Sequence, residues 1–67
     1  MAVPEQMEKS IIELLNSDVS TNQISRKADI NLSIVSKLRN DKIDLQNVKW
    51  FNIKNLYNYS QEVKKGD

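Results

Sequence analysis

The side chains able to take part in chemistry are polar and basic ones concentrated between positions 21 and 42. The sequence contains no cysteine and no histidine, which excludes disulfides, thiolate catalysis, imidazole acid–base chemistry and the common zinc sites. Its one glycine, Gly66, lies near the end of the sequence, so a glycine-rich phosphate loop is excluded as well. Hydroxyl, amide, carboxylate, ammonium and guanidinium groups remain. We therefore expect a binding module and not an enzyme, with no cofactor, metal or small-molecule ligand.

Charge is unevenly distributed along the 67 residues although the net charge is only +1. Residues 1–20 contain one lysine against four acidic residues, a net charge of −3. Residues 21–43 contain five basic residues against two acidic ones, a net charge of +3, and residues 44–67 carry +1. A basic segment beside an acidic one suits a protein that presents one face to phosphate groups. An ordinary solvated surface would explain the same charges.

The length and composition limit the architecture that can position these groups. A 7.8 kDa chain with one glycine and one proline offers few turns for a sheet. We expect one all-α domain over residues 1–67, a compact bundle of four, or at most five, short helices, with residues 1–4 and 64–67 frayed. The sequence has no 20-residue apolar run and no basic–apolar leader, so we expect no membrane partner and a cytoplasmic location.

Two outer helices are predicted from apolar spacing. The first is expected to begin near Pro4, which suits a first helical turn, and to end at residues 16–18. The last is expected to begin between Asn47 and Trp50 and to continue to about Val63, after a loop over residues 40–47 anchored by two apolar side chains. The residues predicted to face the core are Val3, Met7, Ile11, Leu14 and Leu15 in the first helix, Ile43 and Leu45 in the loop, and Trp50, Ile53, Leu56 or Tyr57, Ser60 and Val63 in the last helix.

Two short helices are predicted between them from their start signals. Ser20 and Gln23 have the spacing of a capping box, in which each side chain bonds the other's backbone, and this predicts a helix over residues 21–28. Asn31 is a good N-cap for a second helix over residues 32–39. Only residues 29–31 separate the two helices, and so short a link forces a steep crossing. Two short helices that cross steeply through a three-residue turn describe a helix-turn-helix unit.

Residues 21–41 resemble the helix-turn-helix of small phage and plasmid repressors, the Cro-like or xenobiotic-response-element family. That family has apolar residues at positions four, ten, fifteen and eighteen of a twenty-residue pattern. The run from Ile34 to Asn40 (Ile-Val-Ser-Lys-Leu-Arg-Asn) is similar to the end of the family's recognition helix, and Leu56-Tyr-Asn-Tyr-Ser is similar to its closing helix in small Firmicute-type members. The resemblance covers residues from about 6 to 63 and implies a lambda-repressor-like fold. Counted from Thr21, the four apolar positions are Ile24, Ile30, Val35 and Leu38.

The sequence departs from the family pattern at the turns. Ser25 stands where the family prefers alanine, and Asp29 stands where it prefers a left-handed glycine. Asn40 or Asp41 replaces a second glycine after the recognition helix. Serine is small, and Asp and Asn adopt positive φ at modest cost. We therefore expect both turns to form.

On this fold the helix over residues 32–39 enters the major groove of DNA and the helix over residues 21–28 lies across the backbone. Asparagine can pair with adenine, lysine with guanine and serine with either, and leucine can contact a thymine methyl group. The alternative is that these are ordinary solvated residues on a surface helix. For Asn40 the alternative is a helix stop only. Ile34, if it points outward, contacts either the groove or a partner. The predicted base-contacting residues are Asn31, Leu32, Ser33, Ser36, Lys37 and Asn40, and the predicted backbone-contacting residues are Thr21, Asn22, Arg26, Arg39 and Lys42.

The small size of the domain favours a two-fold dimer, because a single small module buries only roughly 600–1,000 Å² on DNA. We expect a homodimer on a palindromic operator, with Phe51, Tyr59 and Val63 as candidate dimer contacts. The expected function is a sequence-specific DNA-binding transcriptional regulator, a repressor of a phage, plasmid or other mobile element, associated with the nucleoid of a bacterial or phage-infected cell. The alternative is a protein-interaction module on the same fold, such as a phage-encoded inhibitor of a host protein, because the net charge is modest and residues 32–39 include small neutral side chains.

Overall fold

The computed structural model describes residues 3–66, which form four α-helices and one short 3-10 helix and contain no strand. The helices are α1 (Glu5–Leu15), α2 (Thr21–Ala28), α3 (Leu32–Arg39) and α4 (Trp50–Gly66), with the 3-10 helix η1 (Leu45–Asn47) before α4. The all-α prediction is therefore confirmed. None of these helices is long and apolar enough to cross a membrane.

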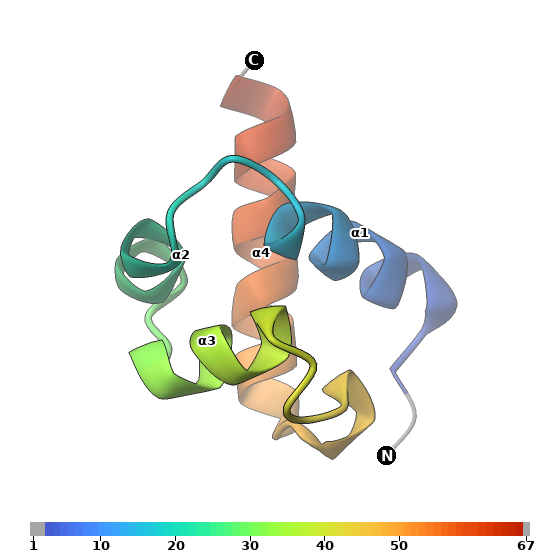
Figure 1. The fold of residues 1–67 in the computed structure, drawn as a ribbon. Coiled ribbons are helices and arrows are strands. Elements are labelled where there is room, and N and C mark those ends of the chain that lie inside the picture. The colour runs from blue at the N-terminus through green and yellow to red at the C-terminus, as the bar shows by residue number, and fades with distance from the viewer. Residues whose placement is uncertain (1–2, 67) are drawn as a thin grey trace.

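The long helix α4 is the axis on which α1 and α2 pack, while α3 packs mainly against α2 and α1 (Figure 1). In that view α1 lies on one side of α4 and α2 on the other, while α3 crosses in front of its lower half. The core between them is formed by side chains from every helix. Its largest fully buried members are Ile11 of α1, Ile24 of α2, Val35 of α3, and Ile53 and Leu56 of α4.

The two central helices begin and end at the residues predicted from their start signals. The Ser20 hydroxyl accepts a hydrogen bond from the Gln23 backbone N–H at 3.1 Å, which caps α2. The Asn31 side chain accepts one from the Ser33 N–H at 2.8 Å, which caps α3. The second half of the expected capping box is wrong. The Gln23 side chain donates to the Tyr59 hydroxyl of α4 at 3.1 Å and does not bond the Ser20 backbone.

The turn between α2 and α3 is held by bonds that converge on Ser25. Its carbonyl accepts the backbone N–H groups of Asp29 and of Ile30, the latter at 3.0 Å, and its hydroxyl donates to the Ile30 carbonyl at 2.6 Å. Asp29 is left-handed (φ 57°, ψ 49°), as is Asp41 after α3 (φ 56°). Both turns therefore form with aspartate in place of glycine, since aspartate tolerates this region.

The predicted inward stripe of α4 is wrong at its first residue. Trp50 is 41% exposed and lies outside the core, whereas the buried side includes Asn52 and Tyr59 in addition to Ile53, Leu56 and Ser60. Tyr59, predicted off the stripe, is only 6% exposed. Ser60 is buried as predicted, whereas Asn52 is a buried polar residue that apolar spacing alone does not reveal. The helix also continues through Lys64 and Lys65 to Gly66, so these residues are not frayed; residues 1, 2 and 67 lie outside the described range.

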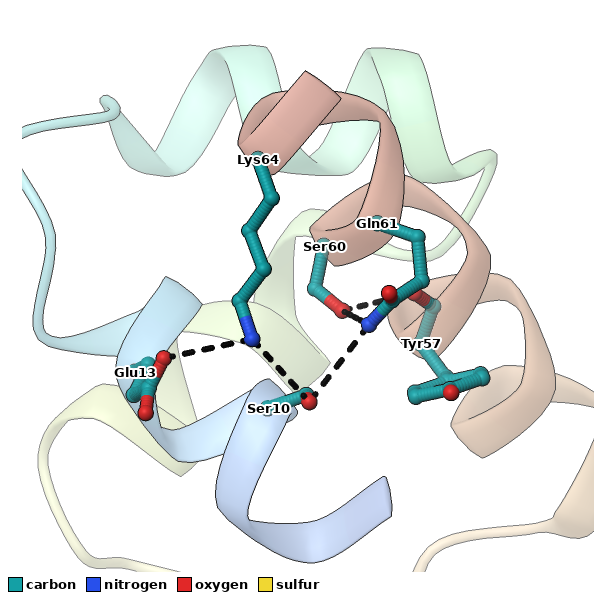
Figure 2. A network of polar contacts seen from close by, with 6 residues as sticks. All are labelled: Ser10, Glu13, Tyr57, Ser60, Gln61 and Lys64. Atoms are coloured by element: carbon teal, nitrogen blue, oxygen red, sulfur yellow. Dashed lines mark hydrogen bonds and ion pairs between the residues drawn. The ribbon is translucent and has the colours of Figure 1, made fainter. Parts of the chain in front are cut away.

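A polar seam joins α1 to the last turns of α4 (Figure 2). The Lys64 ammonium lies 3.5 Å from both the Glu13 carboxylate and the Ser10 hydroxyl, which also accepts from the Gln61 amide at 3.4 Å. The Ser60 hydroxyl donates to the Tyr57 carbonyl within α4 at 2.6 Å. At the other end of α1, the Gln46 side chain of η1 accepts from the Val3 N–H at 2.8 Å and donates to the Glu8 carboxylate at 2.7 Å. These contacts fix α1 against the rest of the bundle, away from α2 and the outer side of α3.

Candidate nucleic-acid interface

A shallow groove of about 530 Å³ lies between the start of α2 and the outer side of α3. It brings together residues predicted for two different roles: two that were predicted to contact the DNA backbone and four that were predicted to contact DNA bases. The residues that line it are Ser20, Thr21, Asn22, Leu32, Ser33, Ser36 and Lys37. The two groups come close because the tight turn at residues 29–31 returns α3 beside α2. Figure 1 shows α2 nearly end-on while α3 lies across the view, so the two axes are steeply inclined.

The outer side of α3 is exposed as predicted, because its inner side is fixed by Val35 and Leu38 in the core. Leu32 is 45% exposed at the first turn, and Lys37 is exposed in the next turn of the helix. Ser36 between them is half-buried. Ile34, which sequence alone left open, is half-buried and lines a separate groove with Phe51. It therefore lies beside α4 and not in the α2/α3 groove.

Both asparagines at the ends of α3 are already used as helix caps. The Asn31 carbonyl oxygen accepts the Ser33 N–H at 2.8 Å, and the Asn40 amide donates to the Ser36 carbonyl at 2.9 Å and to its hydroxyl at 3.4 Å. Bidentate pairing with adenine needs both the oxygen and the NH₂ group of one side chain. Either asparagine would have to weaken these bonds to make that contact, and for Asn31 the N-cap is typically worth about 1 kcal/mol.

The basic side chains lie at different places around the groove. Lys37 lines it, and Arg26 is exposed on α2, where it lines a neighbouring hollow of about 320 Å³ with Asn22 and Lys27. Neither α2 nor α3 contains an acidic residue, so every charged side chain on these two helices is basic. Lys42 instead lines a groove of about 420 Å³ on the α1 side, together with three carboxylates: Glu8, Asp41 and Asp44.

Arg39 differs from the other predicted backbone contacts because its guanidinium is engaged within the protein. Its Nη1 donates to the Thr21 hydroxyl at 3.1 Å, and its Nη2 donates to the Val19 carbonyl at 2.5 Å and to the Ser17 carbonyl at 3.4 Å. The side chain is half-buried. It is therefore not free to reach a DNA phosphate as predicted. The spacing of apolar residues does not predict this contact, because the contact joins a polar side chain to the loop before α2.

The candidate dimer contacts separate into different environments. Phe51 is 58% exposed and adjoins the exposed Trp50, so it remains a candidate. Val63 is half-buried and packs against the core. Tyr59 is buried, with its hydroxyl bonded to Gln23, so the prediction that it contacts a second copy is wrong. A groove of about 270 Å³ beside Phe51 is also lined by Ile34, Ile43 and Val48.

Comparison with known protein families gives no matching family model, and comparison with curated proteins gives no matching sequence.

Proposed function

We propose that the protein is a sequence-specific double-stranded DNA-binding protein that acts as a small transcriptional regulator. In this proposal α2 and α3 form a helix-turn-helix, and α3 enters the major groove. The observation that carries the proposal is the α2/α3 groove, which gathers hydroxyl, amide, ammonium and methyl groups on two helices without a carboxylate. These are the groups that contact phosphates and base edges. Occupation of DNA would suffice to repress a promoter of a phage, plasmid or other mobile element.

The proposed contacts follow from which side chains are free. Lys37 is the principal proposed base-contacting residue, because its ammonium can donate to guanine O6 or N7. Leu32 can pack on a thymine methyl group. Ser33 and Ser36 add hydroxyls beside them. Thr21, Asn22 and Arg26 are the proposed phosphate contacts. Asn31 and Asn40 are proposed to act mainly as helix caps. Because their side chains are used in those bonds, we expect the protein to discriminate adenine from other bases only weakly.

A second copy of the chain is the proposed partner on DNA. The exposed Trp50 and Phe51 at the first turn of α4, with the adjoining apolar groove, form an apolar patch of the kind that marks interaction sites. A two-fold pair would place two α3 helices on half-sites about one helical turn apart. It would also double the few phosphate contacts that one copy can make.

The same apolar patch favours a second candidate function, a protein-interaction module that binds another protein and no specific DNA. Salt dependence separates the two. A DNA-binding dimer that contacts six or more phosphates should lose about 10³-fold or more in affinity between 50 and 200 mM salt. A protein contact made through Trp50 and Phe51 should change little over the same range, because apolar contacts are not screened.

The deciding experiment is selection from a random duplex library, followed by binding measurements on the enriched duplex and on a scrambled one across that salt range. The proposal predicts an enriched sequence with inverted symmetry and binding at least about 10³-fold tighter than to the scrambled duplex. If no sequence is enriched, and binding is weak and equal for both duplexes, the DNA-binding proposal is refuted and the protein-interaction reading takes its place.

A further inference from the structure

We infer that Arg39 is a positioning residue of the proposed DNA-binding groove, which orients the Thr21 hydroxyl toward a DNA phosphate and does not itself touch DNA. The inference rests on the proposed function. Arg39 is the last residue of α3, whereas Thr21 is the first residue of α2, and they are 18 positions apart in the sequence. One guanidinium joins the far ends of the two helices that form the groove.

The guanidinium is held by three neutral oxygen atoms and by no carboxylate. Besides the Thr21 hydroxyl it bonds the carbonyls of Ser17 and Val19, both in the loop that leads into α2. Within residues 3–66 the ion pair found joins Lys64 to Glu13 and does not involve Arg39. The fork of Arg39 therefore fixes the position of α2 relative to α3, and its positive charge stays uncompensated beside the groove.

The bond to Arg39 determines what the Thr21 hydroxyl can do. A hydroxyl carries one hydrogen and two lone pairs, whereas a guanidinium carries only donors. Nη1 must therefore occupy a lone pair of Thr21 Oγ1, which leaves the hydroxyl hydrogen to donate to another acceptor. No hydrogen bond donated by this hydroxyl is found within the described residues, and Thr21 lines the groove. A phosphodiester oxygen of DNA in the groove is the acceptor that this geometry fits.

This role differs from that of a simple charge in a way that lysine substitution measures. Arg39→Lys keeps the charge but replaces a planar fork with a single ammonium, which cannot span the Thr21 hydroxyl and the Val19 carbonyl in the same geometry. We expect it to weaken binding to the selected duplex by about 10-fold, with the slope of log affinity against log salt unchanged. The matched control is Lys54→Arg, an exchange of the same two residue types at an exposed position of α4 outside the proposed DNA contacts, which should bind within about 2-fold of the original chain.

A second variant makes the test independent of how well Arg39→Lys folds. Thr21→Val removes the hydroxyl but keeps the shape of the side chain, and should itself weaken binding about 5- to 10-fold. In the Thr21→Val background the additional effect of Arg39→Lys should fall to about 2-fold or less, because the hydroxyl that it positions is gone. Thr21→Ser retains a hydroxyl and should recover most of the affinity. Circular dichroism melts at the assay salt concentrations confirm that each variant is folded.

Each outcome decides between the inference and the function on which it rests. If the original chain fails to bind any duplex specifically, both are overturned. If the original chain binds but Arg39→Lys binds equally well, or if the two substitutions at positions 21 and 39 act independently, Arg39 is not a positioning residue and the DNA-binding proposal stands. A slope reduced by about one in Arg39→Ala, equal to that in Arg26→Ala, would show instead that Arg39 contacts a phosphate directly.

Discussion

Replacing Val35 and Lys37 separately with alanine should divide stability from DNA binding, although the two residues are only two positions apart on α3. Val35 is fully buried in the core, whereas Lys37 is exposed in the α2/α3 groove. Val35→Ala should therefore lower the free energy of unfolding. Lys37→Ala should lower only the affinity for DNA.

The expected loss for Val35→Ala follows from its complete burial. The substitution deletes two methyl groups, each worth about 0.8 kcal/mol on transfer from water, which gives about 1.6 kcal/mol. Val35 packs within a cluster that includes Ile24, Leu38 and Ile53, so the cavity left behind brings the total to about 2–3 kcal/mol. A domain of this size loses roughly 4–8 °C of melting temperature per kcal/mol. We expect a fall of about 8–24 °C.

The expected effect of Lys37→Ala is confined to binding. An exposed surface substitution changes stability by about 0.5 kcal/mol or less. Loss of the ammonium should weaken specific binding by about 1–3 kcal/mol, which is roughly 5- to 150-fold. Thermal melts followed by circular dichroism and titration of a selected duplex by fluorescence anisotropy measure the two quantities on the same samples.

Two results would refute this reasoning. If Lys37→Ala binds the selected duplex like the original chain, the outer side of α3 is not the reading surface. If Val35→Ala melts within about 2 °C of the original chain, its side chain is not packed as described. The binding of Val35→Ala, measured well below its melting temperature, serves as the control, because it should stay close to that of the original chain.

Three further substitutions test other parts of the molecule. Asp29→Ala should lose about 1 kcal/mol because alanine tolerates a left-handed backbone poorly, whereas Asp29→Gly should match or exceed the original stability; equal melting temperatures for the two would contradict the left-handed turn. Tyr59→Phe should cost about 0.5–1 kcal/mol in urea unfolding, since it removes the acceptor of the Gln23 amide; no change would mean that water replaces this bond. Phe51→Ser should leave the melting temperature unchanged but abolish dimer formation on DNA in sedimentation velocity, because Phe51 is exposed; persistent dimers would place the interface elsewhere.

The central part of the fold could be predicted from the sequence because its signals are local. Ser20 and Asn31 cap the helices that follow them, and a cap depends only on a side chain and a backbone N–H two or three residues away. The bounds of α2 and α3 follow directly. The apolar residues Ile24, Ile30, Val35 and Leu38 are all buried, as their spacing predicts.

Long-range contacts account for what could not be predicted. Trp50 is a large apolar residue that the pattern places in the core, yet it lies outside it. The buried side of α4 includes Asn52 instead, a polar residue that a hydrophobic pattern places outside. Arg39 and Arg26 carry the same side chain, so the sequence alone does not show that they have different contacts. Only the return of the chain at the turn brings its guanidinium to Thr21, and no local spacing encodes that distance.

The order of the helices along the chain has a consequence for folding during synthesis. The helix on which α1 and α2 pack is α4, which the ribosome makes after them. Until its 17 residues have been added, which takes roughly 1–3 s at 5–20 residues per second, apolar side chains such as Ile11 and Ile24 lack their main packing partner. The nascent chain should therefore be a substrate for chaperones that bind exposed apolar segments, and should become compact only when the last helix has emerged.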